Sequence, residues 1–206
     1  MDFWKTLLDS HELIHTGGLI VIALVVFAEC GLFFGFFLPG DYLLFSAGLF
    51  CGTNELDVSI INLLLILLVA SVSGNFVGYF FGKKVGRKLF LRKSSFLFKY
   101  EYLVRTRAYY MKYGGNTLIV ARFFPIIRTF APILAGVVEM NIKKFTIYNV
   151  VGGVLWIVSL VLSGYYLGRR FPNLINYLEY IIVGFLLITS VVLVRAFLKM
   201  RKKKSA

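Results

Sequence analysis

Two arginines lie in a stretch of the chain that is otherwise uncharged. Arg122 and Arg128 fall within residues 114–136, where most other side chains are apolar. A charged side chain at membrane depth is costly and usually has a function. Pro125 and Pro132 interrupt the same stretch, and irregular backbone persists in a membrane only where protein or a water-filled cavity surrounds it. The stretch therefore predicts a re-entrant hairpin that carries a polar site.

The composition is typical of a multi-pass membrane protein. Of 206 residues, 59% are hydrophobic and 17% are aromatic, and the mean hydropathy is +0.80, which exceeds the usual range of soluble domains. The net charge of +13 comes from bases beside apolar segments. This pattern is that of cytoplasmic loops and anionic-lipid contacts, so we do not expect nucleic-acid binding. Cys30 and Cys51 do not indicate a disulfide scaffold.

Five apolar blocks divide the chain. They span about 17–50, 59–82, 114–138, 145–168 and 178–198. One helical crossing needs about 20 residues, so 59–82, 145–168 and 178–198 each predict a single crossing. Block 17–50 is too long for one helix and is broken at Pro39 and Gly40, which predicts a second hairpin.

The distribution of bases predicts which loops are cytoplasmic. Residues 83–112 hold ten Lys and Arg residues against one Glu, and cytoplasmic loops carry such an excess. The basic C-terminal tail, including 199–206, is expected on the same side, and the acidic segment 51–58 on the other. Residues 83–112 form either an amphipathic helix along the cytoplasmic interface or a solvated basic loop.

An internal repeat relates the two halves of the chain at an offset of 86 residues. The matched positions are Phe37 with Phe123, Pro39 with Pro125, Gly78-Tyr79 with Gly164-Tyr165, and Gly82-Lys83-Lys84 with Gly168-Arg169-Arg170. Repeat 1 covers about 1–86 and repeat 2 about 87–172, followed by the C-terminal helix 178–198. Because the matched helices end on opposite sides, the repeats are inverted, a plan typical of transporters. Chance similarity of apolar segments is the alternative.

The two predicted hairpins carry opposite charges. Glu29 and Asp41 lie on the first, and Arg122 and Arg128 lie on the second. Facing each other, they would form a neutral quartet, the least costly arrangement in a low dielectric. The planar guanidinium suits phosphate, and a buried carboxylate can bind and release a proton. We expect the arginines to bind substrate and the acids to couple protons. A salt-bridge network that only fixes the hairpins is the alternative.

Several motifs resemble those of one membrane-protein family. They are Glu29-x-Gly31, Phe37-Leu38-Pro39-Gly40-Asp41-x-Leu43-Leu44-Phe45-x-Ala47-Gly48, Gly78-Tyr79-x-x-Gly82, the arginine stretch, and Met140, Phe145, Tyr148-Asn149-Val150, Gly152 and Trp156. Together they resemble the bacterial DedA family, also called the SNARE-associated or VTT-domain family. The resemblance extends over about residues 20–168.

The resemblance implies a single multi-pass domain, residues 1–206, in the bacterial inner membrane, with two opposed re-entrant hairpins and a cytoplasmic C-terminus. It implies a flippase- or scramblase-like transporter of an anionic lipid, such as undecaprenyl phosphate or a phospholipid, that supports envelope integrity and is coupled to protons. The charged pairs that are essential in relatives match Glu29, Asp41, Arg122 and Arg128. The expected partners are membrane lipid and protons, and a homo-oligomer is left open.

Three other functions are consistent with parts of the sequence. A proton-dependent transporter of small solutes or cations predicts a path sealed from lipid, whereas a lipid transporter predicts a groove open to the side. A membrane scaffold predicts that charge swaps between the acidic and basic pairs restore function.

His11-Glu12-Leu13-Ile14-His15 fits the zinc-protease motif H-E-x-x-H, but no third ligand follows at a recognised spacing. We expect no metal, no cofactor and no enzymatic activity.

Overall fold

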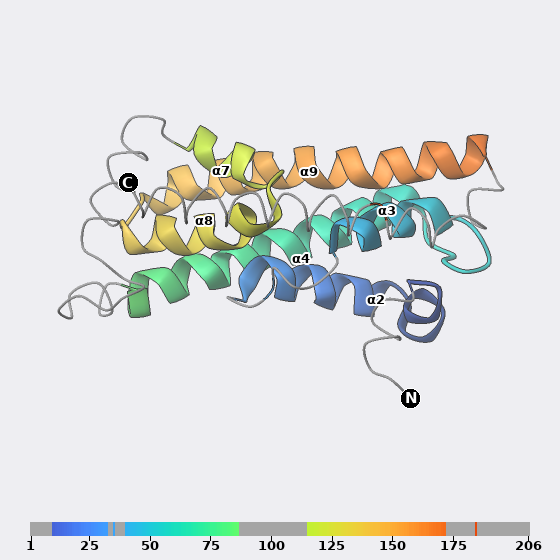
Figure 1. Ribbon diagram of the computed structural model, residues 1–206, viewed down its shortest axis with the longest axis horizontal. Helices are drawn as coiled ribbons and strands as arrows, with labels where there is room; N and C mark the ends of the chain where they lie inside the picture. Colours follow the sequence, from blue (N-terminus) through green and yellow to red (C-terminus); the bar gives the residue numbers. More distant parts are fainter. Residues whose placement is uncertain (1–9, 33–34, 36–39, 87–114, 172–183, 185–206) are drawn as a thin grey trace, which may run out of the picture.

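The computed structural model describes residues 10–32, 35, 40–86, 115–171 and 184. Regular structure in these residues is helical, apart from isolated bridges in the loop around Leu56. The helices are α2 (Ser10–Gly31), α3 (Gly40–Phe50), α4 (Ile60–Phe81), the π-helical turn η2 (Gly82–Gly86), α7 (Asn116–Ala121), α8 (Pro125–Val137) and α9 (Ile142–Arg170). They lie side by side in an elongated bundle (Figure 1). The predicted all-helical fold is confirmed.

Among the described residues, two helices are long and apolar enough to cross a membrane. Residues Ile60–Lys84 have a mean hydropathy of 2.3, and the 29 residues Ile142–Arg170 have one of 2.0. At 1.5 Å per residue they extend about 38 and 44 Å, against a hydrocarbon core of about 30 Å. The helices are antiparallel: near the end of α4, the ring of Tyr79 stacks on Phe145 near the start of α9, with 4.5 Å between centroids. They correspond to the predicted crossings 59–82 and 145–168.

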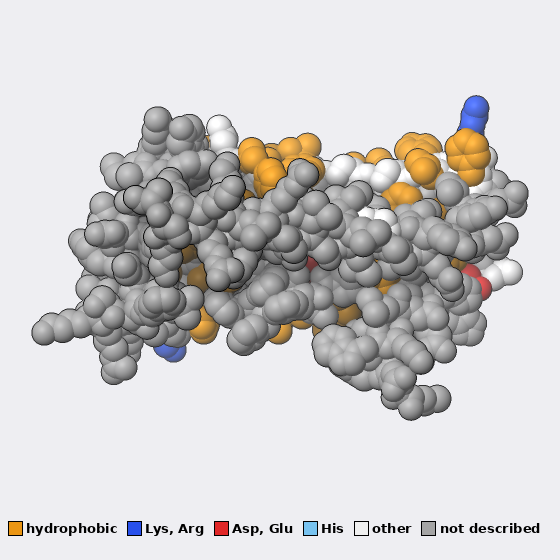
Figure 2. Space-filling model, viewed as in Figure 1, with side chains coloured by type: hydrophobic (Ala, Val, Ile, Leu, Met, Phe, Trp, Pro, Cys, Tyr) orange, Lys and Arg blue, Asp and Glu red, His pale blue; other side chains and the backbone are white. Residues whose placement is uncertain are grey.

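The surface of the bundle is the inverse of a soluble protein's surface. Large apolar side chains of the two long helices are exposed, among them Ile61, Leu65, Val69, Phe80, Ile147 and Leu155. Figure 2 shows hydrophobic side chains on the outside along the edge where α9 lies. The buried side chains include the polar or charged residues Glu29, Ser46, Ser71, Asn75, Arg122, Arg128, Thr129 and Asn149. Apolar residues outside and polar groups inside are expected where lipid is the solvent.

The other helices that the structure describes have regular segments too short to cross. The 11 residues of α3 and the 13 of α8 extend about 17 and 20 Å. Helix α2 changes direction at Gly18, whose φ of +54° is left-handed, and only Gly18–Gly31 of it forms a regular apolar segment. Pro125 is the first residue of α8, where a missing N–H breaks no helical hydrogen bond. Pro39, the segment 178–198 apart from Gly184, and the tail 199–206 lie outside the described residues.

Pro132 does not break the second hairpin, although the sequence predicts that it does. It lies inside α8, which continues to Val137. A proline in a helix removes the hydrogen bond to the carbonyl four residues earlier, here that of Arg128, and its ring crowds that carbonyl, so other contacts must hold the helix together. Buried packing holds the helix together across this position, because Ala131, Ile133 and Ala135 are all buried. The prediction of a break at Pro132 is therefore wrong, and the interruption of the second hairpin lies before Pro125.

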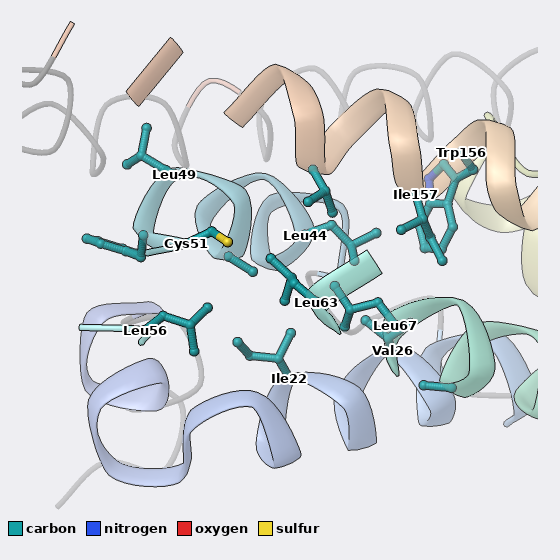
Figure 3. Packing of buried hydrophobic residues seen from close by; sticks show 14 of the residues in the cluster. Ile22, Val26, Leu44, Leu49, Cys51, Leu56, Leu63, Leu67, Trp156 and Ile157 are labelled. Atoms are coloured by element: carbon teal, nitrogen blue, oxygen red, sulfur yellow. The ribbon is translucent and has the colours of Figure 1, made fainter. Parts of the chain in front are cut away.

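The short helices pack on the long ones. Helix α2 lies along α4, α3 along α9, α8 along α4 and η2, and α7 along the first part of α9. The largest buried cluster draws on α2, α3, α4 and α9 (Figure 3), with Ile22, Leu44, Leu63 and Ile157 among its members. Glycines allow these backbones to approach closely: a Cβ at Gly74 would lie 3.1 Å from the Cβ of Cys30 in α2.

Replacing Gly164 by valine is expected to loosen the contact between α9 and α3. A Cβ there would lie 3.0 Å from the carbonyl carbon of Phe45 and 3.1 Å from the nitrogen of Leu49, so the backbones must separate. Overpacking of this kind costs about 1–3 kcal/mol, which should lower the thermal-unfolding midpoint in detergent. Leu155→Val is the control, because it places valine on the exposed face of the same helix. Equal midpoints for the two variants would contradict the close contact.

Candidate functional site

Three of the four predicted site residues form one ion cluster. Arg128, in the first turn of α8, donates through Nη2 to Oε1 of Glu29 near the end of α2. Its Nη1 donates to Oδ1 of Asp41, the second residue of α3, at 2.5 Å. The side chains of Arg128 and Glu29 are 1% and 2% exposed, and that of Asp41 is 28% exposed. We call these three residues the ion triad. It joins both predicted hairpins at the centre of the bundle.

Neighbouring residues hold the triad in place. Trp156 of α9 donates from Nε1 to Oδ1 of Asp41 at 3.0 Å. The guanidinium carbon of Arg128 lies 4.4 Å from the centroid of the Trp156 ring, a favourable cation–π distance. Gly40 leaves room for the acid, because a Cβ there would collide with the Glu29 carboxylate. Gly40 is the first residue of α3, and its lack of a side chain leaves the space that the Glu29 carboxylate occupies.

Arg122 lies apart from the triad. It caps the end of α7 and is only 2% exposed. Its Nη1 donates to Oγ of Ser71 at 2.7 Å, and its Nη2 donates to Oδ1 and to the backbone carbonyl of Asn149 at 2.5 and 3.0 Å. In the described part of the chain no carboxylate pairs with it. The four charged residues thus differ from the expected quartet, because Arg128 binds both acids and neutral oxygens hold Arg122.

Neutral polar residues link the two long helices beside Arg122. Asn149 of α9 donates from Nδ2 to the carbonyl of Val72 of α4 at 3.1 Å. In its satisfied amide orientation, Asn75 of α4 donates to the carbonyl of Cys30 at 3.1 Å and accepts from Nη2 of Arg122 at 2.6 Å. Sequence reasoning missed Ser71, Asn75 and Asn149 as site residues. The available signal was that Ser71 and Asn75 lie four residues apart, on one face of an otherwise apolar helix.

A small pocket connects the two arginines. It lies between α4, α7, α8 and α9 and has a cavity volume of about 10 Å³, which is room for about one water molecule, so a phosphate group enters only if the lining moves apart. Its polar lining consists of Arg122, Arg128, Asn75 and Asn149, and its apolar lining consists of Leu118, Ala131, Pro132 and Phe145. Among the described residues no acid lines it. Two guanidinium groups and two carboxamides in a protein interior favour a small oxyanion, because each can donate hydrogen bonds to it.

The described residues offer no obvious metal centre. Among them, no group of three His, Cys, Asp or Glu side chains is arranged to hold a metal ion. His11 and His15 lie in the first turns of α2, where the side chains are outside the described part, so the zinc motif stays an open alternative. Cys30 and Cys51 are buried free thiols.

Comparison with known proteins identifies the family. Residues 38–166 match the VTT domain. The chain is 38% identical to Protein DedA of Escherichia coli (strain K12) over 187 residues, which cover 88% of this chain and 85% of that protein. An uncharacterized membrane protein of Mycobacterium leprae (strain TN) is 36% identical over 165 residues, 80% of this chain and 72% of that protein.

A more distant relative has a name that gives its location. Inner membrane protein YqjA of Escherichia coli (strain K12) is 29% identical over 174 residues, 84% of this chain and 78% of that protein. No solved structure matches the chain. The resemblance found in the motifs is thus confirmed by the domain match and by the identity to Protein DedA. The chain belongs to the VTT-domain family of membrane proteins, which includes Protein DedA.

Proposed function

We propose that this protein moves an anionic, phosphate-bearing lipid across the bacterial inner membrane and binds the phosphate between Arg122 and Arg128. The pocket between these arginines is the observation that carries the proposal. It holds two buried guanidinium groups without an acidic lining residue among those described. A polyprenyl phosphate and a phospholipid share the group that such a pocket recognises. The protein acts as a transporter, without enzymatic chemistry.

The surroundings of Arg122 favour a lipid over a soluble anion. The apolar side chains next to it in sequence, Val120, Phe123, Phe124 and Ile127, are 58%, 53%, 46% and 50% exposed. In a bilayer these side chains face the acyl chains. A lipid could therefore stay in contact with them while its phosphate enters the polar interior. A soluble solute would require a path sealed from lipid.

The packing supports two opposed re-entrant hairpins in an inverted repeat. Gly136 of the second hairpin lies against Tyr79 of α4 and Lys83 of η2, and Gly48 of the first lies against Val161 and Tyr165 of α9. Tyr79 and Tyr165 are equivalent at the offset of 86 residues. The second arm of each hairpin, α3 or α8, thus rests on the crossing helix of the other repeat, and the first arm, α2 or α7, rests on that of its own repeat. The short arms α3 and α8 meet at the ion triad, as the site of an inverted-repeat transporter does near the midplane.

Charges at the ends of the bundle support the proposed orientation. Lys83 and Lys84, just after α4, and Lys143 and Lys144, at the start of α9, lie at the same end because the two helices are antiparallel (Figure 1). This end fits the cytoplasmic side. The acidic loop 51–58 precedes α4 and lies at the other end.

The ion triad supplies a route for proton coupling. Arg128 lines the pocket while both ends of its fork are held by Glu29 and Asp41. A proton on either acid removes one of these ion pairs, and the freed N–H groups can then bind a phosphate oxygen. Loss of the proton restores the pair and favours release. Proton uptake and anion binding would thus depend on one guanidinium.

Arg122→Lys and Arg128→Lys are expected to lower lipid transport by about tenfold or more, because lysine keeps the charge but loses the fork that binds two oxygens. The measurement uses proteoliposomes with a fluorescent phosphatidic acid and follows its exposure to a membrane-impermeant quencher. Lys143→Arg is the control, since it exchanges the same residue types at an exposed position. Wild-type transport by both lysine variants, with normal insertion, would refute the proposed phosphate site.

A further inference from the structure

Arg122 is a buried cation whose described partners are all uncharged. Two of them are oxygens of one residue, the side-chain Oδ1 and the backbone carbonyl of Asn149. The third is the hydroxyl of Ser71. A buried charge is costly unless other groups satisfy it. Neutral oxygens satisfy the hydrogen bonds but leave the charge uncompensated, so an entering anion gains more from Arg122 than from Arg128, which already binds two carboxylates.

We infer that Asn149 acts as a placeholder: without substrate, its side-chain oxygen occupies the position at Arg122 that a phosphate oxygen takes on binding, and Asn75 completes the same anion site. This inference rests on the proposed function. It assigns the two arginines different roles. Arg122 receives the phosphate first, and Arg128 joins only when an acid of the triad releases it.

The local backbone of α9 is shaped for this arrangement. A Cβ at Gly152 would lie 3.1 Å from Cδ and 3.3 Å from Nε of Arg122, and one at Gly153 would lie 3.4 Å from Nη1. The two adjacent glycines let the guanidinium lie against the helix within reach of the Asn149 carbonyl. Arg122 is thus held flat against α9 on one side and lines the pocket with Arg128 on the other.

Asn75 also reaches the guanidinium of Arg122. In the orientation that satisfies its amide, its nitrogen donates to the carbonyl of Cys30 at 3.1 Å and its oxygen accepts from Nη2 of Arg122 at 2.6 Å. Asn75 therefore adds a second neutral side-chain oxygen at Arg122, which an entering phosphate oxygen would replace.

Asn149→Asp tests the inference by fixing a negative charge at the placeholder position with almost no change of shape. Such a carboxylate competes permanently with the substrate for Arg122. We expect it to weaken binding of dodecyl phosphate by about tenfold or more, because like charges would be brought together. Binding is measured as the rise in the unfolding midpoint of the purified full-length protein in neutral detergent. Transport in the proteoliposome assay should fall in parallel.

Two further variants separate a placeholder from a structural residue. Asn141→Asp adds the same charge to the same helix at the exposed N-cap, where aspartate also caps well, and it should behave as the wild type. Asn149→Ala removes the side-chain oxygen without adding charge, and it should keep dodecyl phosphate binding within about threefold, since the competitor is lost.

The results distinguish a failure of the inference from a failure of the proposed function. Loss of binding in Asn149→Asp together with retention in Asn149→Ala supports the placeholder. Wild-type binding in Asn149→Asp, or equal loss in both variants, overturns it while leaving the proposed function intact. If dodecyl phosphate fails to stabilise even the wild type and no lipid is transported, the proposed function and the inference both fall.

Discussion

Replacing Arg128 by methionine is expected to destabilise the protein by about 3–5 kcal/mol, the usual cost of removing one partner from a buried ion pair. Glu29 would be left as a buried acid that has lost its cation, and Asp41 would lose its bond to Nη1. Methionine keeps much of the apolar stem, so the loss reports the charge rather than the volume. The effect is measured by denaturant unfolding in mixed micelles and by the amount of protein inserted into membranes.

The same experiment distinguishes a scaffold from a transporter. A triple variant that also carries Glu29→Gln and Asp41→Asn has no unpaired charge in the triad and should recover most of the lost stability. It should not recover transport, because it lacks both the guanidinium and the titratable acids. If the triple variant restored function together with stability, the triad would be a structural ion network and the transport mechanism proposed above would be wrong.

The coarse architecture could be predicted because the lipid environment leaves few choices. Apolar length alone identified the crossings that correspond to α4 and α9, since lipid requires every backbone group to bond within its own helix. Charged residues inside apolar blocks are similarly conspicuous, and three of the four candidates meet in the structure as the ion triad. Gly40 was identified as a break, although its contact with Glu29 depends on how two distant helices pack.

The pairing of the charges could not be predicted from the sequence. It depends on Arg128 lying in the first turn of α8 while Arg122 caps α7, and a break of three residues separates these helices. Neutral polar residues give a weaker signal than charges. Ser71, Asn75 and Asn149 were therefore missed, although they hold Arg122. Pro132 was misassigned because a proline can lie within a helix when the surrounding packing retains it.

Glu29→Gln is expected to remove the pH dependence of lipid transport and not merely to lower its rate, because an amide cannot titrate. Glu29 is fully enclosed, and its Oε1 binds Arg128, so Oε2 is the oxygen that can take up a proton. A proton there weakens the hold on Arg128. Asp41→Asn provides the comparison at the partly exposed acid, whose Oδ1 accepts from both Arg128 and Trp156.

The measurement is the initial transport rate in proteoliposomes over a pH series. Asn141→Asp is the control, because it changes one charge at the exposed start of α9, away from the triad. Glutamine at position 29 still accepts a hydrogen bond from Arg128, so the variant keeps most of the contacts of the triad while losing its proton. A flat profile for Glu29→Gln with a sloping one for the control would assign coupling to Glu29. If both amide variants kept the wild-type profile, neither acid would couple protons, and both would be salt-bridge partners that position Arg128 beside the phosphate pocket.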